Sequence, residues 1–213
     1  MSEGPEQEPT LARQVFGDRL EVVRRFAADL AERGVELGLI GPREPERLWS
    51  RHLLNCGVLA SAVPDGARIV DVGSGAGLPG IVLAAARPDL AVTLLEPMAR
   101  RTAWLTEETG RLGLDNVTVL RGRAEEVRGR QDFDVVTARA VGALRTLLPL
   151  TAPLARPGGQ LLLMKGEGVD AELAAAETAV RRLRLADPRV EILDPGEASL
   201  ATRVFRATVP ERQ

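Results

Sequence analysis

The chain is organised around Arg68-Ile-Val-Asp-Val-Gly-Ser-Gly-Ala-Gly-Leu-Pro-Gly80. This stretch predicts a buried strand over Ile69–Val72, then a tight glycine turn, then a helix that opens at Leu78-Pro79. Proline suits a first helical turn because its missing N–H would have had no partner there. Glycines at the carboxyl end of a parallel strand let the backbone come close to a ligand, and open α/β sheets bind their ligands at that end.

Within this stretch, Gly75, Gly77 and Gly80 fit the fingerprint G-x-G-x-x-G of a dinucleotide-binding turn. Glu96 follows at the spacing of an acid that binds a ribose. NAD and S-adenosylmethionine both place a ribose at such an acid, so the fingerprint by itself leaves the cofactor open.

Asp71 favours S-adenosylmethionine over a dinucleotide. Its carboxylate stands two residues before Gly73, at the mouth of the turn, where it would repel a pyrophosphate in a site of lowered dielectric. S-adenosylmethionine has no phosphate and carries a sulfonium and an ammonium group, which a carboxylate attracts. The alternative reading is that Asp71 only caps the loop.

Length and composition set the domain organisation. The 213 residues suit one α/β domain with a modest extension, and 45% hydrophobic residues suffice for a full core. We expect a disordered tail over 1–10 and a helical extension over 11–64, packed as one unit with a methyltransferase domain over 65–213. No apolar run is long enough to span a membrane, and the acidic N-terminus is unlike a signal peptide. A single cysteine, Cys56, excludes an internal disulfide and suits the cytoplasm.

The rest of the sequence alternates strands with helical patterns, which is typical of a mostly parallel sheet. The predicted fold class is therefore α/β, a Rossmann-type (class I) methyltransferase with an N-terminal helical extension and a closing β-hairpin. The expected strands cover 69–72, 91–95, 117–120, 133–137, 160–164, 190–193 and 203–209, and the expected helices cover 11–33, 45–62, 98–112, 144–154 and 171–185.

Chemistry-bearing residues follow the predicted strands, where functional groups of such a sheet gather. Glu96 can accept hydrogen bonds from both ribose hydroxyls with its two oxygens. Ala124 and Glu125 can meet the adenine, although Glu125 is equally well explained as an acid at a helix N-terminus. Arg139 can hold a phosphate or pair with an acid at the place where donor and acceptor meet, or form a salt bridge without a catalytic part. Lys165 can contact an RNA backbone or simply solvate a strand end.

The net charge of −2 gives no global attraction to nucleic acid, so an RNA site needs a local basic patch. Trp104 lies at helical spacing and is predicted to be a core residue. His52 is predicted to be a packed histidine more than an acid or a base. The residues that we assign to RNA binding are Arg51, Arg100, Arg101, Arg123 and Lys165.

Motifs that the sequence lacks reduce the set of methylation reactions that it could catalyse. Methylation of a pyrimidine C5 needs a cysteine nucleophile, and we expect Cys56 to lie on the extension, far from any strand tip. The Asn/Asp-Pro-Pro-aromatic motif of amino-directed methyltransferases is replaced by Ala138-Arg-Ala140, and no cluster has the spacing of metal ligands. What remains suits an acceptor that needs no base, such as a ring nitrogen with a free lone pair.

Several motifs together resemble the RsmG (GidB) family over roughly residues 11 to 210. They are Asp71-Val-Gly-Ser-Gly-Ala-Gly-Leu-Pro-Gly80-Ile, Leu95-Glu96, Arg123-Ala-Glu-Glu126, Phe133-Asp-Val-Val-Thr-Ala-Arg-Ala140 and Lys165-Gly166, with Trp49 and Arg51-His52-Leu53-Leu54 upstream. The chain departs from the family pattern at Glu36–Pro42 and at Asn55-Cys56, which affects the expected RNA contacts of the extension but not the donor site.

This resemblance implies an S-adenosylmethionine-dependent enzyme that methylates N7 of a guanine in 16S rRNA, near the decoding region of the small ribosomal subunit. We expect a cytoplasmic monomer without metal or membrane anchor. A small-molecule methyltransferase, an NAD-dependent oxidoreductase and a non-catalytic RNA-binding factor stay open as alternatives.

The resemblance assigns the methyl donor to Gly73, Leu78, Ala124, Glu125 and Arg139. With the residues chosen above, the predicted donor site is Asp71, Gly73, Gly75, Gly77, Leu78, Glu96, Ala124, Glu125 and Arg139, and Arg139 and Arg123 are the predicted catalytic residues, acting by positioning.

Overall fold

The computed structural model describes residues 4–127, 132–197 and 200–211. They contain the strands β1 (Arg68–Val72), β2 (Ala91–Glu96), β3 (Val117–Arg121), β4 (Phe133–Arg139), β5 (Ala155–Lys165), β6 (Ala186–Leu193) and β7 (Thr202–Thr208). The seven strands form one sheet in the order β3-β2-β1-β4-β5-β7-β6. β1 to β5 run parallel, whereas β7 is antiparallel to both β5 and β6. The α/β class and the closing hairpin are thereby confirmed.

The order of the strands reverses beside β1. β2 and β3 extend the sheet to one side of β1, and β4 begins the other side. Asp71 near the end of β1 pairs in register with Thr137 of β4. The glycine turn after β1 and the end of β4 therefore meet at one edge of the sheet, and such a switch point is where open α/β sheets bind ligands.

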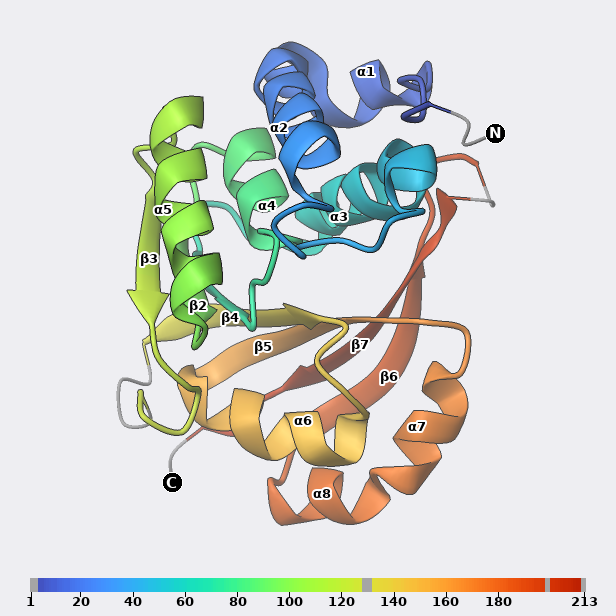
Figure 1. Ribbon diagram of the computed structural model, residues 1–213. Helices are drawn as coiled ribbons and strands as arrows, with labels where there is room; N and C mark the ends of the chain where they lie inside the picture. The colour runs from blue at the N-terminus through green and yellow to red at the C-terminus, as the bar shows by residue number, and fades with distance from the viewer. Residues whose placement is uncertain (1–3, 128–131, 198–199, 212–213) are drawn as a thin grey trace.

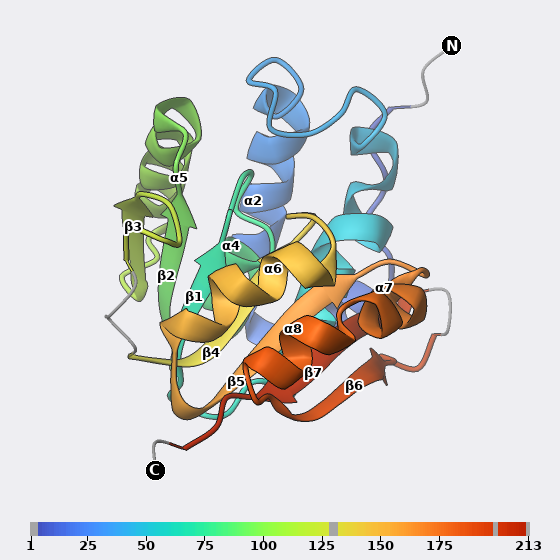
Figure 2. The ribbon, with the colours of Figure 1, turned by 90° about the horizontal axis from the view of Figure 1, so that it is seen from below.

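Each face of the sheet carries its own hydrophobic layer, because successive side chains of a strand point to opposite faces. In β1, Ile69 packs into one layer, and Val70 and Val72 pack into the other. The first layer lies under α2 (Leu20–Arg33), α3 (Leu54–Leu59), α4 (Gly80–Ala86) and α5 (Ala99–Leu112), and the second under α6 (Leu144–Thr151), α7 (Val169–Ala175) and α8 (Glu177–Arg182) (Figures 1 and 2).

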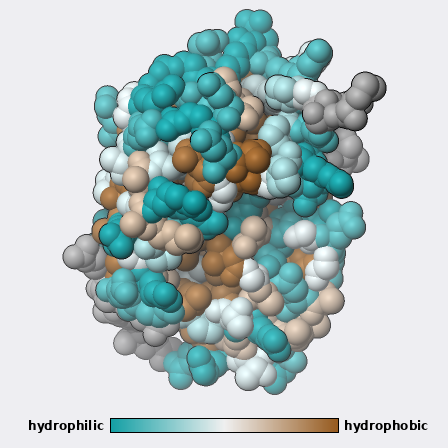
Figure 3. All heavy atoms as spheres, viewed as in Figure 1, coloured by the Kyte–Doolittle hydropathy of each residue, from teal (hydrophilic) through white to brown (hydrophobic). Residues whose placement is uncertain are grey.

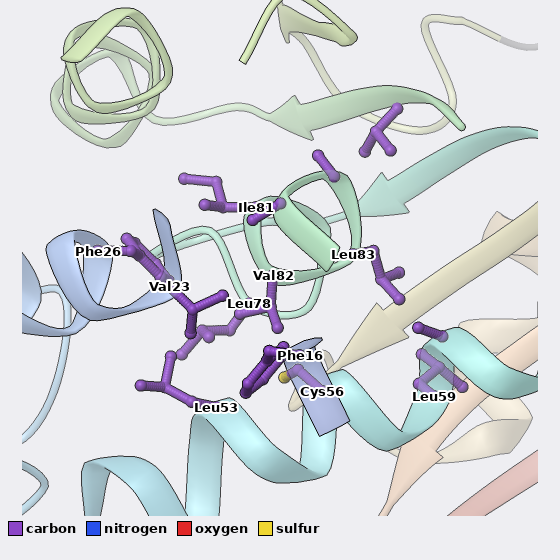
Figure 4. Close-up of a cluster of buried hydrophobic side chains, with 14 of the residues drawn as sticks. Phe16, Val23, Phe26, Leu53, Cys56, Leu59, Leu78, Ile81, Val82 and Leu83 are labelled. Atoms are coloured by element: carbon purple, nitrogen blue, oxygen red, sulfur yellow. The ribbon is translucent and has the colours of Figure 1, made fainter. Parts of the chain in front are cut away.

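The N-terminal helices pack directly on α4, the helix that follows the glycine turn. Phe16, Val23 and Phe26 of the extension lie in one buried cluster with Leu78 and Ile81 (Figure 4). Burial of an aliphatic or aromatic side chain contributes about 1.5–3 kcal/mol, so this cluster fixes the extension firmly against the sheet. The extension thereby forms part of the wall around the switch point.

Most predicted elements match, with a few different boundaries. The single helix expected over 11–33 is interrupted at Gly17, whose φ of 50° ends α1 (Leu11–Phe16). The helix expected from Leu78-Pro79 begins at Gly80, with Pro79 at its N-cap. The helix expected over 171–185 is divided into α7 and α8 at Ala176, which is buried in the core and lies outside helical geometry. None of these differences moves the glycine turn.

Candidate functional site

The turn between β1 and α4 has a left-handed backbone at three glycines, with φ of 73° at Gly73, 58° at Gly75 and 102° at Gly77. A Cβ on Gly73 would lie 3.0 Å from Cγ2 of Val141, beyond the end of β4. A Cβ on Gly77 would lie 2.4 Å from Cδ1 of Ile81. Gly73 and Gly75 line a cavity, whereas Gly77 packs against the first turn of α4.

Glu96 joins the turn to the end of β2. Its buried carboxylate accepts a hydrogen bond from Gly75 N–H through Oε2 (3.0 Å) and another from Met98 N–H through Oε1 (2.9 Å). Each carboxylate oxygen has a further lone pair, and Glu96 also lines the cavity. The residue can therefore hold the turn in shape and still accept hydrogen bonds from a ligand.

Asp71 lies beneath the turn and does not line the cavity. Its Oδ2 accepts a hydrogen bond from Gly80 N–H (3.0 Å), at the start of α4, and its Oδ1 is buried without a hydrogen-bond partner among the described residues. Burial raises the pKa of this carboxyl to about 7. Asp71 supports the turn from below, and near neutral pH it carries less negative charge than the sequence analysis assumes.

The cavity above the turn has a volume of about 620 Å³. It lies between the turn, the start of α5, the end of β4 and the segment that leads to the second helix of the extension. The lining residues are Leu39, Ile40, Gly41, Glu44, Arg51, His52, Gly73, Ser74, Gly75, Ala76, Leu78, Glu96, Pro97, Met98, Arg101, Arg139, Ala140 and Val141. We call this space the donor cavity, after the methyl donor that the sequence predicts for it. Figure 3 shows hydrophobic residues gathered around the hollowed middle of the face seen in Figure 1, with hydrophilic residues around them.

A second cavity of about 510 Å³ adjoins the first. Its lining includes Arg51, Arg139 and Ala140, which also line the donor cavity. We call it the basic cavity, because five of its lining residues are cationic: Arg47, Arg51, Arg139, Lys165 and Arg203. The end of β4 therefore lies between the uncharged glycine turn on one side and the basic cavity on the other.

Arg139 connects this strand tip to the extension. Its Nη1 donates a hydrogen bond to Sγ of Cys56 (3.4 Å), its Nη2 donates to the Arg51 carbonyl (3.3 Å), and Nη2 also contacts Nδ1 of His52. The expectation that Cys56 lies far from any strand tip is wrong, because α3 crosses the end of β4. Cys56 is fully buried and burial raises the pKa of its thiol, so its surroundings still disfavour a nucleophilic thiolate.

Other predicted residues lie apart from the two cavities. Ala124 and Glu125 follow β3, which β2 separates from β1, and neither they nor Arg123 line the donor cavity or the basic cavity. Gly122 N–H donates to the Glu96 carbonyl (3.2 Å), so this segment is a neighbour of the donor cavity. The donor contacts of Ala124 and Glu125 stay predictions.

Some of the predicted RNA-binding residues line one of the two cavities and others do not. Arg51 and Lys165 line the basic cavity, and Arg101 lines the donor cavity. Arg100 is exposed on the first turn of α5 and lines neither cavity. Lys165 pairs with Glu172 (2.7 Å) and donates to the Gly142 carbonyl (2.7 Å), so part of its charge is used inside the protein. Sequence reasoning missed Arg47 and Arg203, which no motif marks.

Trp104 is buried and donates its Nε1–H to the Ala76 carbonyl (3.0 Å), which confirms its place in the core. Among the described residues, no group of three or more His, Cys, Asp or Glu side chains could hold a metal ion. No helix in the described part of the chain is long and apolar enough to cross a membrane.

The parallel sheet with an antiparallel β7, the glycine turn and the carboxylate at the end of β2 define a Rossmann-type methyltransferase. Among solved structures of this fold, M. jannaschii TYW2 in complex with AdoMet aligns with a TM-score of 0.58 at 18% identity, covering 78% of each chain. The tRNA (m1A58) methyltransferase TrmI from Aquifex aeolicus aligns with a TM-score of 0.57 at 13% identity, covering 73% of this chain and 68% of TrmI.

Closer sequence relatives identify the family. The family model for GidB, described as rRNA small subunit methyltransferase G, matches residues 19–200. The chain is 52% identical over 204 residues to ribosomal RNA small subunit methyltransferase G of Clavibacter michiganensis, covering 96% of both chains. It is 51% identical over 209 residues to the protein of that name from Leifsonia xyli, covering 98% of this chain and all of the relative. The chain belongs to the GidB family of rRNA small subunit methyltransferases, as the motifs predict.

Proposed function

We propose that this enzyme transfers a methyl group from S-adenosylmethionine to N7 of a guanine in 16S rRNA, near the decoding region of the small ribosomal subunit. It acts in the cytoplasm and as a monomer. The observation that carries the proposal is the junction at Arg139 and Ala140, where a cavity built on the glycine turn meets a cavity lined by arginines. Family membership supports the same conclusion.

The donor cavity fits S-adenosylmethionine in size and in chemistry. The close approach of Gly73 to Val141 leaves no room for a Cβ, and Glu96 can accept hydrogen bonds from two ribose hydroxyls. Met98, which is 47% exposed, offers apolar surface beside them. Gly73, Gly75, Leu78, Glu96 and Arg139 would hold the donor, and the bound donor supplies a methyl group activated by a positively charged sulfur. Ala124 and Glu125 extend this set on the side of the adenine.

The basic cavity suits the RNA. Arg51 and Arg203, which line this cavity, would neutralise phosphates of the bound RNA, and such contacts supply most of the sequence-independent affinity for nucleic acid. The target base has to leave its stack to reach the junction, at a cost of about a few kcal/mol. Neutralised phosphates and the shape of the cavity offset that cost.

Guanine N7 needs no general base, because its in-plane lone pair carries no proton. The surroundings of the junction agree with this chemistry. The imidazole of His52 is engaged by Arg139 and Glu44, and the Cys56 thiol is buried. The side chains act by orienting the two reactants and excluding water, which accounts for a large part of the acceleration of such a displacement. Cationic groups belong on phosphates here, since the methylated guanine itself becomes positively charged.

The test is methylation of purified small ribosomal subunits from a strain that lacks this protein. Isotope-labelled S-adenosylmethionine and the purified enzyme should place label on one guanine of 16S rRNA, and nucleoside mass spectrometry should identify 7-methylguanosine. Parallel reactions contain naked 16S rRNA, a mixture of small metabolites, and NAD in place of the donor. Label on metabolites alone, or calorimetric binding of NAD without binding of S-adenosylmethionine, would overturn the proposal.

A further inference from the structure

A chain of three polar side chains lines the donor cavity and connects the extension to the end of β4. Glu44 lies in the segment before the second helical region, His52 lies in the helical turn Trp49–Leu53, and Arg139 ends β4. His52 Nε2 contacts Glu44 Oε2, and His52 Nδ1 contacts Arg139 Nη2. His52 is only 8% exposed, so water does not replace these partners.

The partners determine which nitrogen of the His52 ring carries the proton. A guanidinium group has N–H donors and no acceptor, so Nδ1 must be the unprotonated nitrogen that accepts from Arg139. Nε2 then carries the hydrogen and donates it to the Glu44 carboxylate. Burial and the neighbouring charge of Arg139 lower the pKa of His52 to about 4, which agrees with a neutral ring.

Glu44 is charged in this arrangement. Burial works to raise the pKa of its carboxyl, but hydrogen bonds from Arg47 and His52 outweigh burial and hold that pKa below its usual value. Arg47 donates to Glu44 Oε1 at 2.6 Å and also lines the basic cavity. Glu44 therefore anchors the Nε2 side of the ring and fixes one tautomer, as a carboxylate does for a histidine that ligates a metal.

We propose that His52 is a positioning residue: its Nδ1 holds the Arg139 guanidinium at the junction of the donor cavity and the basic cavity, and Glu44 fixes the ring in the required tautomer. The proposal rests on the proposed function, because it assigns Arg139 a place between methyl donor and RNA. The other contacts of Arg139 are to the Cys56 sulfur, which is a weak acceptor, and to the Arg51 carbonyl at 3.3 Å, which is long for a hydrogen bond of a charged donor. His52 is thus the main anchor of this side chain.

Two substitutions of His52 separate positioning from general packing. The side-chain oxygen of asparagine stands where Nδ1 stands, so His52→Asn keeps an acceptor for Arg139. The amide of glutamine reaches the place of Nε2, so His52→Gln keeps a partner for Glu44 and loses the acceptor for Arg139. We expect His52→Gln to lower the single-turnover rate roughly ten- to a hundredfold at saturating donor and subunit, and His52→Asn to recover most of the wild-type rate. Equal rates for the two variants would overturn the proposal.

A spectroscopic test needs neither donor nor RNA. His52 is the only histidine in the sequence, so a chain labelled with ¹⁵N-histidine gives the signals of this ring alone. At neutral pH we expect a neutral ring with the proton on Nε2, and an Nε2–H resonance protected from exchange. Glu44→Ala should remove that protection, whereas Glu46→Ala, an exposed acid two residues away, should preserve it.

A ring protonated on Nδ1 in the wild-type chain, or equal protection in the two alanine variants, would overturn the proposal. This measurement also distinguishes the proposal from the proposed function. If the ring has the expected tautomer but no methyl group is transferred to 16S rRNA, the proposed reaction is wrong. If methylation occurs and the tautomer is different, the fault lies in the role of His52.

Discussion

Arg139 Nη1 donates a hydrogen bond to the sulfur of Cys56, 3.4 Å away and 83 residues earlier in the chain. This contact ties the end of β4 to α3 of the extension. The extension is therefore a wall of the candidate site as well as the proposed surface for RNA, and a thiol of the extension contacts a residue of that site. Changes in the extension should consequently affect methyl transfer even where they touch no RNA.

The glycine turn provides the first prediction. Gly73→Ala should weaken S-adenosylmethionine binding by at least roughly tenfold, because its new Cβ would meet Val141 at 3.0 Å in a backbone with φ of 73° and a left-handed residue costs about 1–2 kcal/mol. Gly66→Ala is the matched control. Gly66 has φ of 65° and open space around a Cβ, and it does not line the donor cavity. Calorimetry should show weakened binding for Gly73→Ala only, and comparable losses in both variants would point to backbone strain instead.

Glu96 is expected both to stabilise the glycine turn and to bind the ligand. Glu96→Gln replaces one acceptor oxygen by an NH₂ group, which must then face the N–H of Gly75 or Met98. We expect donor binding to weaken by about 1–3 kcal/mol and the melting temperature to fall. Glu32→Gln, on the exposed side of α2, should change neither. Donor affinity within twofold of the wild type would show that another group holds the ribose.

The basic cavity should dominate RNA binding despite the net charge of −2. Arg51→Gln combined with Arg203→Gln should raise the KM for small subunits and reduce the slope of log affinity against log salt by about one for each lost phosphate contact. Arg181→Gln combined with Arg182→Gln, both exposed on α8, which covers the face of the sheet away from the extension (Figure 1), is the control of equal charge. Arg123→Gln tests the family-derived assignment outside the two cavities. An unchanged slope in the double variant would place the RNA elsewhere.

Glu108 should make stability depend on pH. It is fully buried between α5 and α2, and burial together with the neighbouring Asp29 carboxylate raises the pKa of its carboxyl from 4.5 to about 7. A raised folded-state pKa means that the folded protein binds the extra proton, so its stabilising effect is complete below the unfolded-state pKa and is lost as pH rises to about 7. We expect urea unfolding to show a loss of roughly 2–3 kcal/mol from about pH 5 to about pH 8 through this group.

Glu108→Gln should remove this part of the pH dependence. Burial of Asp71 likewise raises its pKa to about 7, so a smaller slope should persist in the variant. Glu107→Gln is the matched control, because a hydrogen bond from Arg33 lowers the pKa of Glu107 and its titration falls below this range. A slope that is identical in wild type and Glu108→Gln would mean that Glu108 stays charged in the folded protein.

Much of the donor site is determined locally and was predictable from the sequence. The strand, the glycine turn and the helix of 68–86 follow from hydrophobic periodicity and from glycines that tolerate positive φ. Glu96 was predictable for the same reason, because in a parallel sheet the acid after the second strand comes to the same edge as the first turn. The resemblance of these motifs to one family then led to the reaction.

Only the tertiary structure decided which side chains lie beside that turn. Glu44, Cys56 and Arg139 meet because the extension folds back over the end of β4, and Arg203 joins them from β7 at the other end of the chain. Contacts between segments so distant in sequence depend on how whole hydrophobic layers pack, and no local pattern encodes them. Asp71 is a further example: its place in the motif was predictable from the sequence, but its full burial beneath the turn is a property of the packed core.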